Sequence, residues 1–248
     1  MSGDLRIAAA RRVDRTRALT STVVGAAAVL AGCAGVTGTA IPAPEPVRVA
    51  TPLADLMVPP SAFPPQFPAA VVLPPAAVAQ AAADLTGIPD GARVDPPGCR
   101  PPVTDRGPDG TVIAVGRRDD AHATLTVELA RTDRALDALR DQLEQCPQVS
   151  AVRDELGHIG STVHTEILSA PSVDTDDTLA LRRTVDSGDH LGTLRQSLLT
   201  LVAQHGDVRI SATLMSFGDA ANGTETDTVA TVALDALFTT AADRVRAG

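Results

Sequence analysis

The prolines of this chain are concentrated in one stretch, which limits where a folded core can form. Eleven of the 19 prolines fall between residues 34 and 75, where apolar residues follow neither a helical nor a strand period. Proline fixes φ and has no N–H to donate, so such a run favours an extended, semi-rigid spacer. We therefore expect residues 33–73 to be a disordered Pro-rich tether and residues 74–248 to form one domain. Phe63 and Phe67 are exceptions in the tether, being large apolar side chains that could dock on the domain.

The segment before the tether has the layout of a bacterial export signal. Five arginines precede residue 18, and an apolar run from Val23 to Ala31 follows, too short to span a bilayer. The motif "LAGC" at residues 30–33 resembles the lipobox, in which the signal is cleaved before a cysteine whose thiol is then acylated. We expect residues 1–32 to be a lipoprotein signal peptide and Cys33 to anchor the protein on the extracytoplasmic face of the cell membrane. An ordinary signal peptide or a short anchor is the alternative.

Two cysteines remain once Cys33 is assigned to the lipid anchor. In an exported protein they face an oxidising environment, so we expect a disulfide between Cys99 and Cys146. Such a bridge would stabilise the domain by roughly 4 kcal/mol on the chain-entropy model. Two buried free thiols are the alternative, and two cysteines without a nearby histidine do not indicate a metal site.

Composition excludes several functions. The chain has no lysine, so a Walker A lysine, a Schiff-base lysine and a Ser-x-x-Lys nucleophile are all impossible. Beyond residue 33 the chain carries 16 arginines and 28 acidic residues. An acidic surface of this kind repels phosphate backbones, and we expect no nucleic-acid partner.

Hydrophobic periodicity after residue 73 predicts an α+β fold. Helical spacing appears three times and strand-like spacing six times, in the order α-β-β-α-β-β-β-β-α. We expect a mostly antiparallel sheet of about six strands with helices packed on it. The expected helices span 74–86, 132–146 and the C-terminal residues from 228; the expected strands span 110–115, 121–131, 162–169, 178–185, 193–204 and 208–216.

Four local patterns make sharper predictions. Thr132 is expected to cap the second helix, and Leu125, Val127 and Leu129 are expected to form the buried side of a half-buried strand. "HGD" at residues 205–207 is typical of a tight hairpin. The expected buried face of the C-terminal helix contains Val229, Val232, Ala233, Ala236 and Leu237, widened by Leu234 and Phe238.

No catalytic signature is present, and we expect no enzyme activity and no cofactor. Ser187, Asp189 and His190 are the residue types of a hydrolytic triad, but neighbours in a turn rarely reach the required geometry. His158 and His164 lack a third metal ligand at useful spacing, so no metal site is expected. The acidic stretch 172–178 lacks the glycine and glutamate of a calcium loop; it is interpreted as a solvated turn, with weak cation binding as the alternative.

Arg183 is the residue most suggestive of ligand contact. On a strand it lies on the same side as Leu179, Leu181 and Val185, and therefore points inward. A buried arginine needs a partner, which could be Glu128, Glu166 or a carboxylate of a ligand. An internal ion pair, or strand bending that brings Arg183 to water, is the alternative.

The segments "PPQFPAAVVLPP" and "DLTGIPDGARVDPPGC", together with the placement of Cys99 and Cys146, resemble mycobacterial and related actinobacterial lipoproteins of unknown function. They are also similar to the extracellular sensor domain of PknH-type serine/threonine kinases. The resemblance implies an α+β domain with a ligand cleft, although that sensor has two disulfides and this chain has cysteines for one. We therefore expect a lipid-anchored envelope protein that binds a small molecule, a lipid or a protein partner. The alternative is an accessory scaffold of an envelope complex without a small-molecule pocket.

Overall fold

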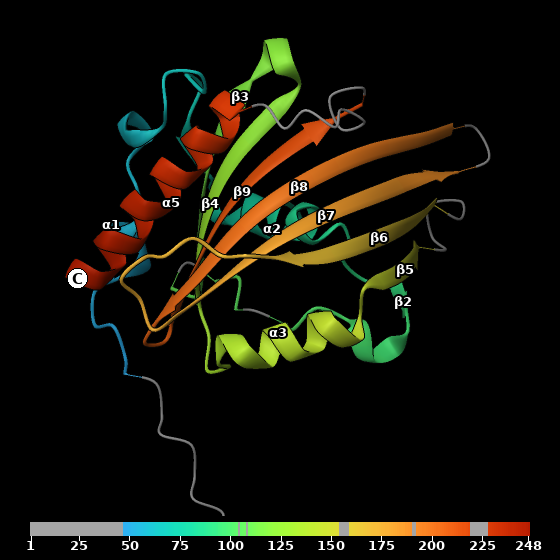
Figure 1. Ribbon diagram of the computed structural model, residues 1–248, viewed down its shortest axis with the longest axis horizontal. Coiled ribbons are helices and arrows are strands. Elements are labelled where there is room, and N and C mark those ends of the chain that lie inside the picture. Colours follow the sequence, from blue (N-terminus) through green and yellow to red (C-terminus); the bar gives the residue numbers. More distant parts are fainter. Residues whose placement is uncertain (1–46, 104, 108, 154–158, 190–191, 219–227) are drawn as a thin grey trace, which may run out of the picture. The chain divides into compact units, whose positions relative to one another are not determined.

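An antiparallel sheet of nine strands is the framework of the described residues, with strand order β1-β3-β4-β9-β8-β7-β6-β5-β2 (Figure 1). The α+β prediction is confirmed, whereas the expected number of about six strands is wrong. All six expected strands are present, and three further ones extend the sheet. The strands are β1 (Val71–Val72), β2 (Arg93–Asp95), β3 (Thr111–Arg118), β4 (Ala123–Arg131), β5 (Gln148–Arg153), β6 (Ile159–Leu168), β7 (Asp177–Asp189), β8 (Gly192–His205) and β9 (Val208–Phe217).

This computed structural model describes residues 47–103, 105–107, 109–153, 159–189, 192–218 and 228–248. The expected signal peptide, residues 1–32, and the expected lipidation site, Cys33, therefore lie outside the described residues. No helix in the described ranges is both long enough and apolar enough to cross a membrane.

The three additional strands are short, and their sequences explain why no pattern indicated them. β1 has two residues and β2 has three, and they form the two edges of the sheet. Prolines follow both of these strands within two residues and limit their length. β5 directly follows the proline that ends a helix, and only two of its side chains, Val149 and Ala151, are buried. Alternation over so few residues is too weak to indicate a strand.

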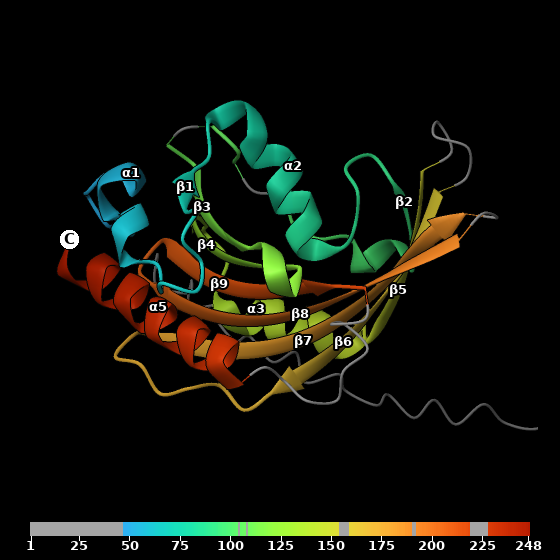
Figure 2. The ribbon, with the colours of Figure 1, turned by 90° about the horizontal axis from the view of Figure 1, so that it is seen from above.

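Helices cover both faces of the sheet. α5 (Thr228–Ala247) packs on one face, across β4, β8 and β9, while α2 (Pro75–Thr86) lies on the opposite face (Figure 2). α3 (Leu136–Gln145) shares the face of α2, because Leu136 packs on Leu179 and Val202. Side chains alternate along β8 accordingly: Leu201 belongs to the cluster under α5, and Val202 belongs to the cluster under α3.

Two helices differ in detail from the sequence prediction. Ala135, not Thr132, is the N-cap of α3, and the Thr132 hydroxyl instead accepts a hydrogen bond from the Arg134 N–H before the helix begins. In α5 the expected Val229 and Val232 are more than half exposed, and the expected Ala236 is exposed as well. Many small apolar residues in α5 allow more than one apolar face, and the bulkier residues decide which one packs. The buried set is Ala230, Ala233, Leu234, Leu237, Phe238, Ala241, Ala242 and Val245.

The ordered domain includes much of the expected tether. Leu53 and Leu56 of α1 (Leu53–Leu56) and both Phe63 and Phe67 belong to the core cluster under α5. Gly116 of β3 makes room for the phenylalanines, since a Cβ there would lie 2.7 Å from the Phe63 ring. The expected tether was to end at residue 73, but residues from 47 onward already pack with the domain. Bulky apolar side chains between the prolines make this packing possible where regular structure is missing.

Arg131 at the end of β4 fastens the first described residues to the hairpin between β8 and β9. Its guanidinium donates to the carbonyl oxygens of Val49 and Thr51 and forms a 2.9 Å ion pair with Asp207. The Asp207 carboxylate also accepts a hydrogen bond from the Val49 N–H. The predicted tight hairpin is present, with Gly206 at a φ of 55°.

Candidate ligand cavity

A cavity of about 250 Å³ lies between the sheet and the helices α2 and α3. Its floor is formed by strands β4, β9, β8 and β7, in that spatial order. Its walls come from α2, from α3 and from residues 88–91, 99–103 and 106. The cavity therefore lies on the sheet face opposite α5, where α2 and α3 leave the centre of the sheet uncovered.

The floor is polar along a line that crosses the sheet. Glu128 of β4 is paired with Ser211 of β9, and Thr213 of β9 is paired with Thr200 of β8. The hydroxyls of these two threonines lie 3.1 Å apart in a hydrogen bond. The expectation that β4 is half-buried is therefore wrong, because its polar side faces the cavity rather than bulk solvent and Thr126 on that side is only 4% exposed.

The walls are largely apolar. Leu139 and Leu143 of α3 contribute from one side and Leu85 of α2 from the other. Val163 of β6 and Leu181 of β7 continue the apolar surface along the sheet toward α3. A cavity with an apolar wall and a few convergent polar groups is the usual form of a small-molecule site.

Glu128 is a carboxyl held inside the cavity without a partner. It forms no hydrogen bond or ion pair with any other described residue. Burial raises the pKa of Glu128 to about 7, although the charges of Arg106, Arg209 and Arg183 act in the opposite direction. The Glu128 carboxyl therefore changes its protonation state near neutral pH.

Arg183 points into the same cavity, as its position on the strand predicts. Burial lowers its pKa to about 10, partly offset by the charge of Glu128, so the guanidinium stays protonated at neutral pH. Among the described residues no carboxylate lies within 4.0 Å of this guanidinium. Glu166, the other expected partner, instead pairs with Arg182 at 3.1 Å on the opposite face of β7. The nearby Glu128 thus influences Arg183 without contacting it.

Two further arginines face the cavity, and the sequence analysis missed both. The guanidinium of Arg209 on β9 donates hydrogen bonds to the carbonyl of Arg134 and to the side-chain oxygen of Gln204. Arg106 pairs with Asp90 at the rim. The Nε atoms of both arginines are buried and have no hydrogen-bond partner among the described residues. Arg209, Ser211 and Thr213 are alternate polar residues of β9 and repeat the polar alternation of β4. This pattern could have indicated that Arg209 lies on the same face of the sheet as Glu128.

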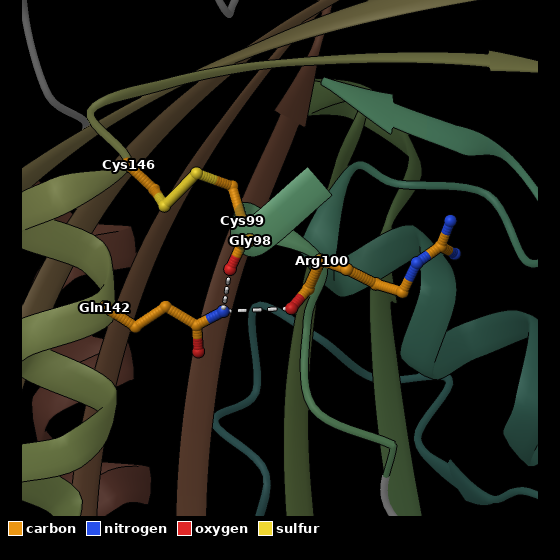
Figure 3. Close-up of a disulfide and its surroundings, with 5 residues drawn as sticks. All are labelled: Gly98, Cys99, Arg100, Gln142 and Cys146. Atoms are coloured by element: carbon orange, nitrogen blue, oxygen red, sulfur yellow. Dashed lines mark hydrogen bonds between the residues drawn. A yellow bond between two sulfur atoms is a disulfide. The ribbon is translucent and has the colours of Figure 1, made fainter. Parts of the chain in front are cut away.

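The predicted disulfide is present and forms part of the cavity wall (Figure 3). The Cys99–Cys146 bridge has an S–S distance of 2.06 Å and a Cα–Cα distance of 5.6 Å. It ties the turn Pro97–Cys99 to the C-terminal end of α3, and the Gln142 amide donates to the carbonyls of Gly98 and Arg100 beside it. The bridge therefore fixes residues 88–106 against the helix that borders the cavity.

The remaining residues considered from sequence do not converge. His164 is an exposed residue of β6 and Ser187 lies on β7, whereas His158 and His190 lie outside the described residues. The acidic turn separates its carboxylates, with Asp174 bound to Arg246, Asp177 to Arg140 and Asp176 to the Gly206 N–H. In the described part of the chain no cluster of three or more potential metal ligands occurs.

Comparison with known proteins gives little guidance. No protein-family model matches the chain, and no curated protein matches it. A solved structure, an uncharacterized protein from Mycobacterium smegmatis (the Rv0999 ortholog), is a distant neighbour with a TM-score of 0.41 and 16% sequence identity. The similarity covers 75% of this chain and 92% of the other. Function must therefore be argued from the cavity.

Proposed function

We propose that this protein is a lipid-anchored protein of the cell envelope whose domain binds a small molecule in the cavity between the sheet and the helices α2 and α3. The observation that carries the proposal is the pair Glu128 and Arg183, two charged side chains that face the cavity without a protein partner. Unpaired charges inside a protein are unfavourable. A ligand that bonds to them would remove that penalty, which is the expected behaviour of a binding site.

The envelope location rests on the sequence. The lipobox-like motif before Cys33 supports a lipid anchor, and the Cys99–Cys146 bridge is consistent with an oxidising compartment outside the cytoplasm. The resemblance to the PknH-type sensor domain supports a binding role over a catalytic one. The described residues that line the cavity also include no histidine that could activate the Thr200, Ser211 or Thr213 hydroxyl.

A scaffold role in an envelope complex has a narrower basis. Val229 and Val232 on α5 are 52% and 62% exposed and lie one helical turn apart. Two exposed valines are a small apolar surface, and single exposed apolar residues are normal on soluble domains. The cavity therefore supports ligand binding better than this surface supports a protein partner.

Native mass spectrometry tests the proposal. The exported chain with Cys33→Ser, which removes the thiol of the expected lipid anchor, is purified from an actinobacterial host and measured under native and denaturing conditions. We expect an additional mass in the native spectrum that is lost on denaturation.

The matched variant Ser211→Trp places a large side chain in the cavity from a floor position that is only partly buried. It is expected to fold, as judged by circular dichroism, and to lose the bound mass. A bound mass that persists in the folded Ser211→Trp variant would contradict the cavity as the binding site. A bare native mass, together with no shift in melting temperature across a fragment library, would contradict ligand binding altogether.

A further inference from the structure

The charge of the cavity is opposite to that of the protein. The whole chain has a formal net charge of −9, yet four arginines and two carboxyls line the cavity. One of the carboxyls, Glu128, is about half neutral near pH 7 because of its raised pKa. The interior of the cavity is thus positive on an acidic molecule, which favours an anionic ligand over a cationic one.

The cavity is lined by both charged and apolar side chains. Arg183 of β7, Arg209 of β9 and Glu128 of β4 are the charged groups of its floor. Leu139 and Leu143 of α3 and Leu85 of α2 are apolar parts of its walls. A ligand that satisfies both kinds of group needs an acidic head and an apolar body. The volume of about 250 Å³ suits a small molecule with a single short chain or ring.

We propose that the cavity binds an organic anion with a short apolar body, whose acidic head lies against Arg183 and whose body packs on the leucines of α3. This inference rests on the proposed function and specifies its ligand class. A guanidinium group matches carboxylate and phosphate heads in geometry and can bond an acidic head through two N–H groups without a metal ion. The hydroxyls of Thr200 and Thr213 lie on the floor between the strands of Glu128 and Arg183 and supply further hydrogen bonds to the head.

Glu128 couples binding to protonation. An acidic head beside Glu128 favours its neutral form, in which the carboxyl donates a hydrogen bond instead of repelling the ligand. The other ionisable groups that line the cavity are Asp90, Arg100 and Arg106 from the loop, Arg183 from β7 and Arg209 from β9. Asp90 is paired at the rim with Arg106, Arg183 has a pKa of about 10, and burial raises the pKa of Glu128 to about 7, so we assign the pH dependence of binding to Glu128.

A series of four probes with one tail and different heads tests the ligand class: octanoate, octyl phosphate, octanol and octylamine. Isothermal titration calorimetry at pH 6.5 is expected to show octanoate and octyl phosphate binding at least about tenfold more tightly than octanol, with octylamine weakest. The affinity for octanoate is expected to fall about three- to tenfold between pH 6 and pH 8. Glu128→Gln, which imitates the neutral carboxyl, is expected to remove that pH dependence.

Arg183→Met and Arg182→Met form a matched pair of variants, since neighbouring residues of β7 point to opposite faces. Arg183→Met is expected to reduce the preference for octanoate over octanol to less than about threefold. Arg182→Met, whose side chain is solvent-exposed beside Glu166, is expected to leave the preference unchanged. Equal effects of the two variants would overturn the role of Arg183.

The ligand class and the proposed function fail in different ways. Octanol binding as tightly as octanoate, with both lost in Ser211→Trp, would overturn the anionic class and leave the cavity as a binding site. The same holds if octylamine binds most tightly. Failure of every probe, with a bare native mass, would overturn both.

Discussion

Glu128→Gln offers the most direct test of the charges inside the cavity, because the pKa of this carboxyl is raised in the folded protein and not in the unfolded chain. An ordinary glutamate has a pKa of 4.5, and burial raises that of Glu128 to about 7 in the fold. The folded state therefore holds the proton more tightly than the unfolded chain. Ionisation of Glu128 leaves stability unaffected below pH 4.5, lowers it increasingly between pH 4.5 and 7, and has its full effect above pH 7.

The expected size of the effect follows from the pKa shift. Each unit corresponds to about 1.4 kcal/mol, so the ionised carboxyl lowers the free energy of unfolding by at most about 3 kcal/mol. Part of the Glu128 side chain faces the cavity, where water screens the charge. We therefore expect Glu128→Gln, which keeps the shape but cannot ionise, to stabilise the protein by about 1–3 kcal/mol at pH 8 and to be nearly neutral at about pH 4.5.

Chemical unfolding measured by circular dichroism is the appropriate assay, since the chain has no tryptophan or tyrosine to report by fluorescence. Glu166→Gln is the control, because Glu166 is exposed and its ion pair with Arg182 lies in solvent. Its effect should be small and similar at both pH values. A stability difference for Glu128→Gln that is the same at both pH values, or a loss of stability at pH 8, would refute the reasoning. Either result would mean that ionised Glu128 is stabilised by a partner in solution.

Three further predictions concern the framework around the cavity. Cys146→Ser removes the bridge to Cys99 and should lower the free energy of unfolding by about 2–4 kcal/mol in urea titrations. It should also weaken octanoate binding, because the disulfide forms part of the cavity wall. Unchanged affinity would show that the wall stays in place without the bridge. Arg131→Ala should speed hydrogen exchange in residues 47–51 and destabilise the domain by about 1–3 kcal/mol, whereas slow exchange there would contradict the fastening role. Gly116→Ala should lower the free energy of unfolding by about 1–3 kcal/mol, and the melting temperature with it, since its Cβ would lie against Phe63. An unchanged melting temperature would show that the ring has room to move.

The sheet was largely predictable from sequence because its long strands carry apolar and β-branched residues over eight or more positions, bounded by polar turns. β7, β8 and β9 lie where the pattern predicts them, and the residues of the hairpin at Gly206 indicated how two of them connect. Strands that depend on their neighbours were missed. The three residues of β2, for example, are extended because they pair with β5, which no local pattern can indicate.

The cavity was predictable only in part, for a related reason. The alternation in β7 placed Arg183 inside, and the cysteine count gave the disulfide. The sequence named Glu128 as one possible partner of Arg183, but it could not show that a second layer of helices also covers the polar side of β4. Arg209 and Arg106 approach the cavity from a different strand and from a loop, and their meeting with Glu128 depends on the strand order and the loop path. Tertiary arrangement, rather than local propensity, assembles these groups.

A combined replacement of Glu128 and Arg183 by methionine separates a binding role of these charges from a structural one. Buried charges replaced together by apolar residues of similar size often leave a protein equally or more stable, whereas breaking a supporting ion pair costs about 3–5 kcal/mol. Because Glu128 and Arg183 do not contact each other, we expect the double variant to be at least as stable as the original protein in unfolding experiments at pH 7. Titration calorimetry should show that it no longer prefers octanoate to octanol. A strongly destabilised double variant would instead mean that the two charges support the fold, and the argument for a ligand at this site would lose its basis.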